Sequence, residues 1–140
     1  IINVHLWLKD NPFKEKFYGL IDSQIHWVFN HGSHITLTSS AADGMILLNE
    51  GEIKGLCYSE LEKFFHIFHR EIVVDSKIIK EKRATVVPDI VSAKMRNNFK
   101  PSINGMVIAG DWIDTGLPST IESAVLSGRM AASKVINSLK

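Results

Sequence analysis

The chain has 140 residues, 45% of them hydrophobic, and a formal net charge of +1, which suffices for one hydrophobic core and leaves no basic block of the kind that binds nucleic acid. No apolar run approaches the roughly 20 residues that a membrane-spanning helix needs. The single cysteine, Cys57, excludes an internal disulfide and favours a reducing, cytoplasmic compartment.

Several short segments near the N-terminus have the composition of β-strands. Residues 2–8 alternate apolar and polar side chains, apart from Trp7 on the polar side, as expected for a strand with one buried face. Residues 17–21 and 24–30 are rich in aromatic and β-branched side chains, and residues 34–39 alternate again. Because short turns separate these segments, we predict an antiparallel β-meander.

The hydrophobic spacing changes from that of a strand to that of a helix in the middle of the chain. Apolar side chains recur every three or four positions from Ile53 to Phe68, which places them on one helical face. Asn49 and Glu52 have the spacing of a capping box. We therefore predict one amphipathic helix over about residues 51–69, with its phenylalanines in the core.

The next segment is more polar and less regular. A charged start and an apolar end predict a strand over residues 76–87, which Pro88 stops, and a brief strand at residues 72–74 is also compatible with the sequence. Residues 89–101 are polar and predict a loop, with a helical turn at residues 90–95.

The most informative stretch lies near the C-terminus. Residues 106–109 are an apolar run followed by Gly-Asp, which predicts a buried strand that stops abruptly. Residues 111–117 form a polar loop, and residues 118–138 form the final helix, with Ser119 or Thr120 as its N-cap. The predicted inner face of this helix consists of Ile121, Ala124, Val125, Gly128, Ala131, Ala132 and Val135.

The junction of this strand, loop and helix is a candidate ligand site. Gly110 would let a ligand approach the backbone closely, and Asp111 would accept hydrogen bonds from ligand hydroxyls. The amides at the helix start carry partial positive charge, which suits a phosphate or another electron-rich group. Ordinary α/β packing produces the same pattern, so the residues alone leave both interpretations open.

Other kinds of site have less support. The six histidines do not have the spacing of a zinc motif, so we predict no metal site. No serine lies in a Gly-x-Ser-x-Gly motif, and Cys57 lies on the apolar side of a predicted helix. Glu122 falls in the first turn of the final helix, where a carboxylate is favourable for structural reasons alone. The sequence therefore identifies no catalytic residue.

Residues 109–132 resemble the C-terminal FAD-binding signature of the amine oxidase and phytoene desaturase superfamily. The run Thr-Gly-Leu-Pro-Ser-Thr-Ile-Glu-Ser-Ala at 115–124 is most similar to the squalene-associated branch, the hydroxysqualene dehydroxylases. Residues 3–7 and 26–30 resemble that branch too, and residues 82–85 resemble the segment that links its substrate and FAD domains.

The resemblance implies an α+β fold class and a division into two parts. Residues 1–87 would belong to a substrate-binding domain, with the meander and the amphipathic helix. Residues 88–140 would be the C-terminal, α/β segment of an FAD-binding domain, with the buried strand and final helix. The chain lacks the Gly-x-Gly-x-x-Gly motif that holds the FAD pyrophosphate in whole members. We therefore expect a cut chain that needs the missing N-terminal Rossmann half, or a partner chain that supplies it.

FAD is the cofactor that the resemblance implies. Gly110 and Asp111 would lie near the ribityl–pyrophosphate, and the helix start at Ser119, Thr120 and Ile121 would face the pyrimidine carbonyl of the flavin. Amides in that place would stabilise the negative charge of the reduced ring. The implied reaction is hydride transfer between flavin and a long isoprenoid, which in the closest branch means reductive loss of a hydroxyl.

The aromatic residues of the meander have two interpretations. In the first, they would line an isoprenoid tunnel like that of the resembled branch; in the second, they would face a core or another domain. These residues are Trp7, Phe17, Tyr18, Trp27 and Phe29. A hydrocarbon substrate leaves peripheral contact with a membrane open, and the oligomeric state is unassigned.

We expect the chain alone to be inactive. Two alternatives remain open for its function. One is a fragment of a flavin amine oxidase or protoporphyrinogen-type oxidase. The other is a non-catalytic remnant or assembly module that works only with a partner chain.

Overall fold

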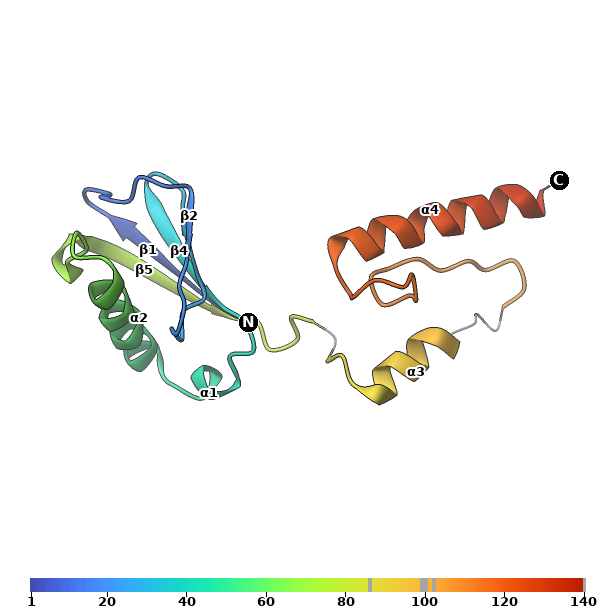
Figure 1. The fold of residues 1–140 in the computed structure, drawn as a ribbon, viewed down its shortest axis with the longest axis horizontal. Coiled ribbons are helices and arrows are strands. Elements are labelled where there is room, and N and C mark those ends of the chain that lie inside the picture. Colours follow the sequence, from blue (N-terminus) through green and yellow to red (C-terminus); the bar gives the residue numbers. More distant parts are fainter. Residues whose placement is uncertain (86, 99–100, 102, 140) are drawn as a thin grey trace. The chain divides into compact units, whose positions relative to one another are not determined.

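The chain folds as two compact units, Ile1–Ala84 and Thr85–Lys140 (Figure 1). The computed structural model describes residues 1–85, 87–98, 101 and 103–139. The boundary lies close to the expected division between residues 87 and 88. The assignment of the two parts to a substrate-binding and an FAD-binding domain stays a prediction.

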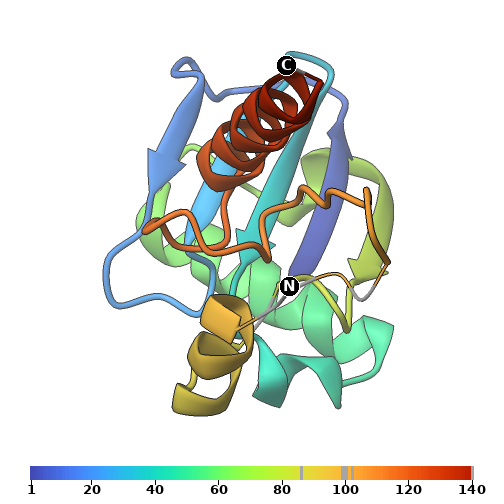
Figure 2. The same cartoon turned by 90° about the vertical axis from the view of Figure 1, so that its right-hand side faces the viewer.

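Five antiparallel strands form the sheet of the first unit. They are β1 (Ile2–Leu8), β2 (Phe17–Gly19), β3 (Trp27–Asn30), β4 (His34–Ser39) and β5 (Val73–Lys80). Their order in the sheet is β2-β3-β4-β1-β5, and Figure 2 shows them side by side.

The predicted meander is confirmed, because β2, β3 and β4 follow one another along the chain and pair in that order. The strands predicted at residues 2–8 and 34–39 have the observed bounds, whereas the strand predicted at 24–30 is shorter. Gly32, with a φ of 82°, lies in the turn from β3 to β4 and has a backbone conformation that other residues rarely adopt.

One face of the sheet packs against the helix α2 (Glu50–Phe64) (Figures 1 and 2). The side chains that β1 and α2 bury in this core are Ile2, Val4, Leu6, Leu8, Ile53, Cys57 and Leu61. The predicted capping box forms, since the Glu52 amide donates to the Asn49 side chain and the Asn49 amide donates to the Glu52 carboxylate. Two short elements, α1 (Asp43–Ile46) and the 3-10 helix η1 (Arg70–Ile72), complete the unit.

The helix α2 ends before the predicted end at residue 69. Phe65 has an extended backbone, with φ −129° and ψ 97°, and its ring packs edge-on against Phe13 with 5.0 Å between centroids. Phe68 is also buried in the core. The prediction of core phenylalanines is therefore right for these two residues, but the chain leaves the helix to bring them to Phe13.

The strand β5 differs from the two strands predicted at 72–74 and 76–87. It is one strand that begins at Val73 and ends at Lys80. Lys80 pairs with Ile2, and the Glu81 amide donates to the carbonyl of Ile1 at 2.9 Å. The pairing of β5 with β1 ends at this point. Residue 86 of the predicted strand lies outside the described residues.

The second unit contains two helices, α3 (Ile90–Asn98) and α4 (Ile121–Ser138). The sequence predicted only a helical turn at 90–95 within a loop, so α3 is longer than expected. Asp89 begins α3 with a reciprocal pair of hydrogen bonds, in which its carboxylate accepts from the Ser92 amide and its amide donates to the Ser92 hydroxyl. Among the described residues, no helix is long and apolar enough to cross a membrane.

The buried strand predicted at residues 106–109 is wrong for this structure. These residues have no regular secondary structure, and Met106 and Ala109 are exposed. A strand exists only where a neighbour takes its backbone hydrogen bonds, and the described residues of the second unit contain no strand to pair with it.

The predicted inner face of α4 is right only in part, because Ala124, Gly128 and Ala131 are half-buried and its other members are exposed. Ile121 is 86% exposed, and Val125 and Val135 are exposed as well. The buried side chains of this helix are Ser123 and Ser127. The physical reason is that α4 packs against the polar backbone of the preceding loop, which serines can hydrogen-bond and aliphatic side chains cannot.

Candidate functional site

The loop before α4 is held on that helix by its two buried serines. The Gly110 amide donates to Ser127 Oγ at 2.8 Å, and the Ser123 hydroxyl donates to the carbonyl of Asp111 at 3.4 Å. The hydroxyls of Thr115 and Ser123 lie 2.7 Å apart. These bonds fix the Gly110–Asp111 end of the predicted cofactor site to α4.

The start of α4 leaves backbone donors without partners. Thr120 is the N-cap, and its hydroxyl accepts from the Ser123 amide. Within the described residues, no group accepts a hydrogen bond from the amides of Ser119, Thr120 or Ile121. Ser119 is half-buried and the other two are exposed. Three of the five predicted cofactor-binding residues therefore present open donors at the positive end of an 18-residue helix.

Gly110 and Asp111 lie at the other end of the same loop. A Cβ atom at Gly110 would meet the indole of Trp112, with Cδ1 at 2.9 Å, so the space beside this glycine is taken by Trp112. The carboxylate of Asp111, by contrast, has no hydrogen-bond donor among the described residues, and the residue is half-buried. It keeps its capacity to accept from ligand hydroxyls. Direct contact of either residue with a cofactor stays a prediction.

Arg96 of α3 is a part of this region that sequence reasoning missed. Its guanidinium donates to the carbonyls of four described loop residues, at distances from 3.0 to 3.3 Å. Those residues are Asp111, Trp112, Ile113 and Leu117. No local sequence pattern predicts this role, because the partners lie 15 to 21 residues away along the chain.

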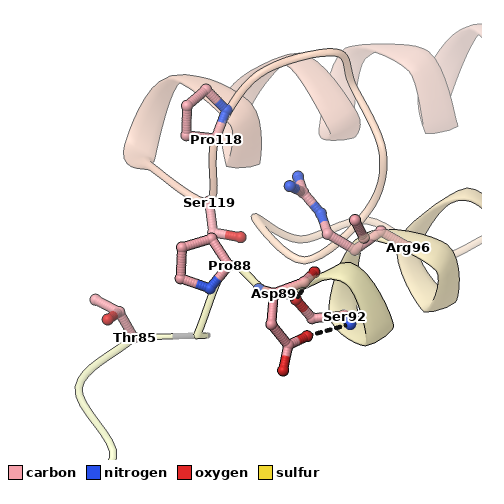
Figure 3. A pocket seen from close by; sticks show the side chains of 8 residues that line it. Thr85, Pro88, Asp89, Ser92, Arg96, Pro118 and Ser119 are labelled. Carbon is pink, nitrogen blue, oxygen red and sulfur yellow. Dashed lines mark hydrogen bonds between the residues drawn. The ribbon is translucent and has the colours of Figure 1, made fainter.

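A pocket of about 320 Å³ lies between the start of α3 and the residues before α4 (Figure 3). Its lining residues are Thr85, Pro88, Asp89, Ser92, Ala93, Arg96, Pro118 and Ser119. Hydrogen bonds from the Ser92 amide and hydroxyl lower the pKa of Asp89, which keeps its carboxylate ionised. Ser119 is the member of the predicted cofactor set that lines this pocket; Gly110, Asp111, Thr120 and Ile121 do not.

The sheet of the first unit has an aromatic face on the side away from its core. Alternation places Phe17, Trp27 and Phe29 on this face, with exposures of 57%, 42% and 37%. Their ring centroids lie 6.0 to 6.4 Å apart. Trp7 lies on the same side and stacks on His34 at 5.4 Å. Four of the five aromatic residues that the sequence singled out therefore share one face.

Tyr18 is the exception, because it points to the core side of the sheet. Its ring packs edge-on against Phe65 at 5.0 Å. Its hydroxyl accepts from the amides of Lys14 and Glu15 at 3.1 and 3.0 Å. For this residue the interpretation as a core side chain is right.

His5 lies on the aromatic face in the central strand β1. Its Nδ1 is 3.0 Å from the hydroxyl of Thr36, which is the directly paired residue of β4. Burial and the charges of His34, His31 and Lys77 lower its pKa. The imidazole therefore favours its neutral form, and its ring centroid lies 6.2 Å from that of Trp7 on the same face.

The described residues offer little for other chemistry. They contain no group of three or more His, Cys, Asp or Glu side chains placed to hold a metal ion. Burial raises the pKa of the Cys57 thiol to about 12, so it stays protonated and unreactive at neutral pH.

Comparison with known proteins gives matches over nearly the whole chain. A family model described as "Flavin containing amine oxidoreductase" matches residues 4–136. Three curated relatives are named hydroxysqualene dehydroxylase. The protein of Zymomonas mobilis is 29% identical over 94% of this chain, that of Rhodopseudomonas palustris 28% over 97%, and that of Sinorhizobium fredii 24% over 94%. The chain spans only 31–32% of the length of these relatives.

Proposed function

The chain belongs to the flavin containing amine oxidoreductase family, and on that basis we propose that it is the C-terminal part of an FAD-dependent oxidoreductase acting on a long isoprenoid. The observation that carries the proposal is the set of open amides at Ser119, Thr120 and Ile121, at the start of α4. Their place in the chain coincides with the part that resembles an FAD-binding signature.

The residues of this region fit the flavin end of FAD. When bound, FAD supplies the hydride chemistry. The amides at the start of α4 would donate to the electron-rich edge of the ring and would favour its negatively charged form. Asp111 would accept from hydroxyls of the ribityl chain. Thr120 keeps the helix start in place through its cap to Ser123.

The aromatic face of the sheet is the proposed wall for the substrate. Phe17, Trp27 and Phe29 offer an exposed hydrocarbon surface that a soluble domain rarely leaves uncovered. A polyisoprenoid chain has matching chemistry, because it carries no charge and buries apolar area along its whole length. The named activity of the three relatives makes reductive loss of a hydroxyl the specific reaction that we propose.

We propose further that the chain needs a second part that carries the dinucleotide-binding motif. Within the described part of the chain, the amides of Val107, Ile108 and Ala109 have no hydrogen-bond acceptor, and a strand of such a part would supply one. Exposed apolar side chains of α4, among them Ile121 and Val125, would be covered at the same time.

A flavin titration tests the proposal. FAD is added to the chain alone, and to the chain mixed with the N-terminal part of a hydroxysqualene dehydroxylase, while flavin absorbance is recorded. We expect no spectral shift with the chain alone and a saturable shift with both parts present. Absence of any shift in the mixture, with both parts folded by circular dichroism, contradicts the proposal.

Product analysis then separates the alternatives. The reduced, reconstituted protein is incubated with hydroxysqualene, and squalene is measured by mass spectrometry. Formation of squalene supports the dehydroxylase assignment. Release of hydrogen peroxide from amine or porphyrinogen substrates would instead favour the oxidase alternative, and flavin binding without any turnover would favour the assembly module.

A further inference from the structure

The guanidinium of Arg96 lies at the centre of the loop that joins the two halves of the candidate cofactor site. Its Nη2 donates to the carbonyls of Asp111, Ile113 and Leu117 at 3.1, 3.0 and 3.0 Å. Its Nε donates to the carbonyl of Trp112 at 3.3 Å. One side chain of α3 thus binds nearly the full length of the loop.

This arrangement is electrostatically favourable. Carbonyl oxygens carry partial negative charge, and several that converge on one point repel one another unless a cation lies between them. Arginine suits this role because its planar fork offers five donors in fixed directions. Among the described residues, Arg96 has no carboxylate partner, so its positive charge is shared by the loop carbonyls alone.

The direction of these carbonyls constrains the backbone conformation of the loop. Because each peptide unit is planar and trans, a carbonyl that faces Arg96 directs the following amide away from it. The loop also sets the separation between Asp111 at one end and Ser119 at the other. Arg96 and Ser119 line the same pocket (Figure 3).

We propose that Arg96 is the positioning residue of the cofactor loop: it fixes residues 111–117 in the conformation that binds flavin before the cofactor arrives. The part of the proposal that concerns flavin rests on the proposed function. The part that concerns the loop does not, and can be measured on the chain alone.

The first experiment measures hydrogen exchange of the loop amides in the unliganded chain. The amides of Ile113, Gly116 and Leu117 are hydrogen-bonded within the loop. We expect Arg96→Met to speed their exchange at least tenfold and Arg96→Lys to speed it less, since lysine keeps the charge but not the fork. Unchanged exchange in Arg96→Met overturns the proposal.

Arg129→Met is the matched control. Arg129 is an exposed arginine of α4, and no hydrogen bond or ion pair joins it to another described residue. The control should leave loop exchange at the wild-type rate. Equal acceleration by Arg129→Met and Arg96→Met would show a general effect of lost charge, which also overturns the proposal.

The second experiment uses the reconstituted flavoprotein and measures the dissociation constant and absorbance spectrum of bound FAD. We expect Arg96→Met to weaken FAD binding at least tenfold and to alter the spectrum of the flavin that still binds, with partial rescue by Arg96→Lys. Wild-type affinity and spectrum in Arg96→Met overturn the role toward the cofactor. If the reconstituted wild-type protein does not bind FAD, the proposed function fails. Faster exchange of the loop amides in Arg96→Met would still support the role of Arg96 in holding the loop.

Discussion

At the scale of single residues, the candidate site depends on a few side chains with specific partners. The sequence singled out Gly110, Thr120 and Ile121 because glycine, a capping residue and a helix start leave local signals; the structure confirms Thr120 as the N-cap, and a role of the three toward a cofactor stays a prediction. It did not find Arg96, whose partners come close only when α3 and the loop fold together. Local spacing cannot carry that information, since it comes from tertiary structure.

Gly110 supplies the first prediction at this scale. A methyl group there would meet the Trp112 indole, so we expect Gly110→Ala to lower the free energy of unfolding by about 1–3 kcal/mol. Gly128 has open space around its Cα position within α4. Gly128→Ala should therefore raise the stability by up to about 1 kcal/mol. Urea denaturation of both variants checks this, and a shift of the same sign in both contradicts the structure at Trp112.

His5 supplies a prediction about pH. Its pKa is lowered in the folded chain by burial and by His34, His31 and Lys77, whereas in the unfolded chain it has its ordinary value near 6.5. The unfolded state thus binds more protons as the pH falls below about 6.5, so folding stability declines there. We expect His5→Gln to make the stability less dependent on pH between 7 and 5. Denaturant midpoints that fall in parallel for both proteins would count against this account.

At the scale of elements, the alternation and capping patterns predicted the strands and helix starts that are determined by a segment's own residues. The strands β1 and β4 and the start of α2 follow from patterns within seven residues or fewer. The bounds of β5 and the lack of a strand at 106–109 depend on a neighbour, since β5 is defined by its pairing with β1 and the described part of the second unit contains no strand beside 106–109. The buried face of α4 likewise depends on the loop that lies against it.

The capping box of α2 supplies a prediction for an element. Asn49 accepts from the Glu52 amide at 3.0 Å, so Asn49→Ala leaves this donor without its partner. We expect a loss of about 0.5–2 kcal/mol in unfolding free energy. Ser59→Ala, at an exposed position inside the same helix, serves as the control and should change stability little, because alanine is the better helix former. Equal losses in both variants would rule out the cap as the cause.

At the scale of the whole molecule, the two units differ in how much apolar surface they bury. The first unit has its own sheet, helix and apolar core. The second has two helices and a long loop, its buried α4 residues are serines, and it leaves apolar side chains exposed. This difference agrees with a chain that spans about a third of its relatives, and it is the physical basis for proposing that the second unit is completed by another part.

The most direct test of the central claim removes one amide at the start of α4 without disturbing the helix. Ile121→Pro does this, because proline is tolerated at the first helical position, and the extended backbone of Thr120, with φ −138° and ψ 172°, suits a residue before proline. Ile121→Ala is the control that shortens the same side chain and keeps the amide. FAD affinity is measured for both in the reconstituted protein. Because both variants lose the isoleucine side chain, the account predicts binding about tenfold weaker for Ile121→Pro than for Ile121→Ala; equal affinity of the two variants would contradict it.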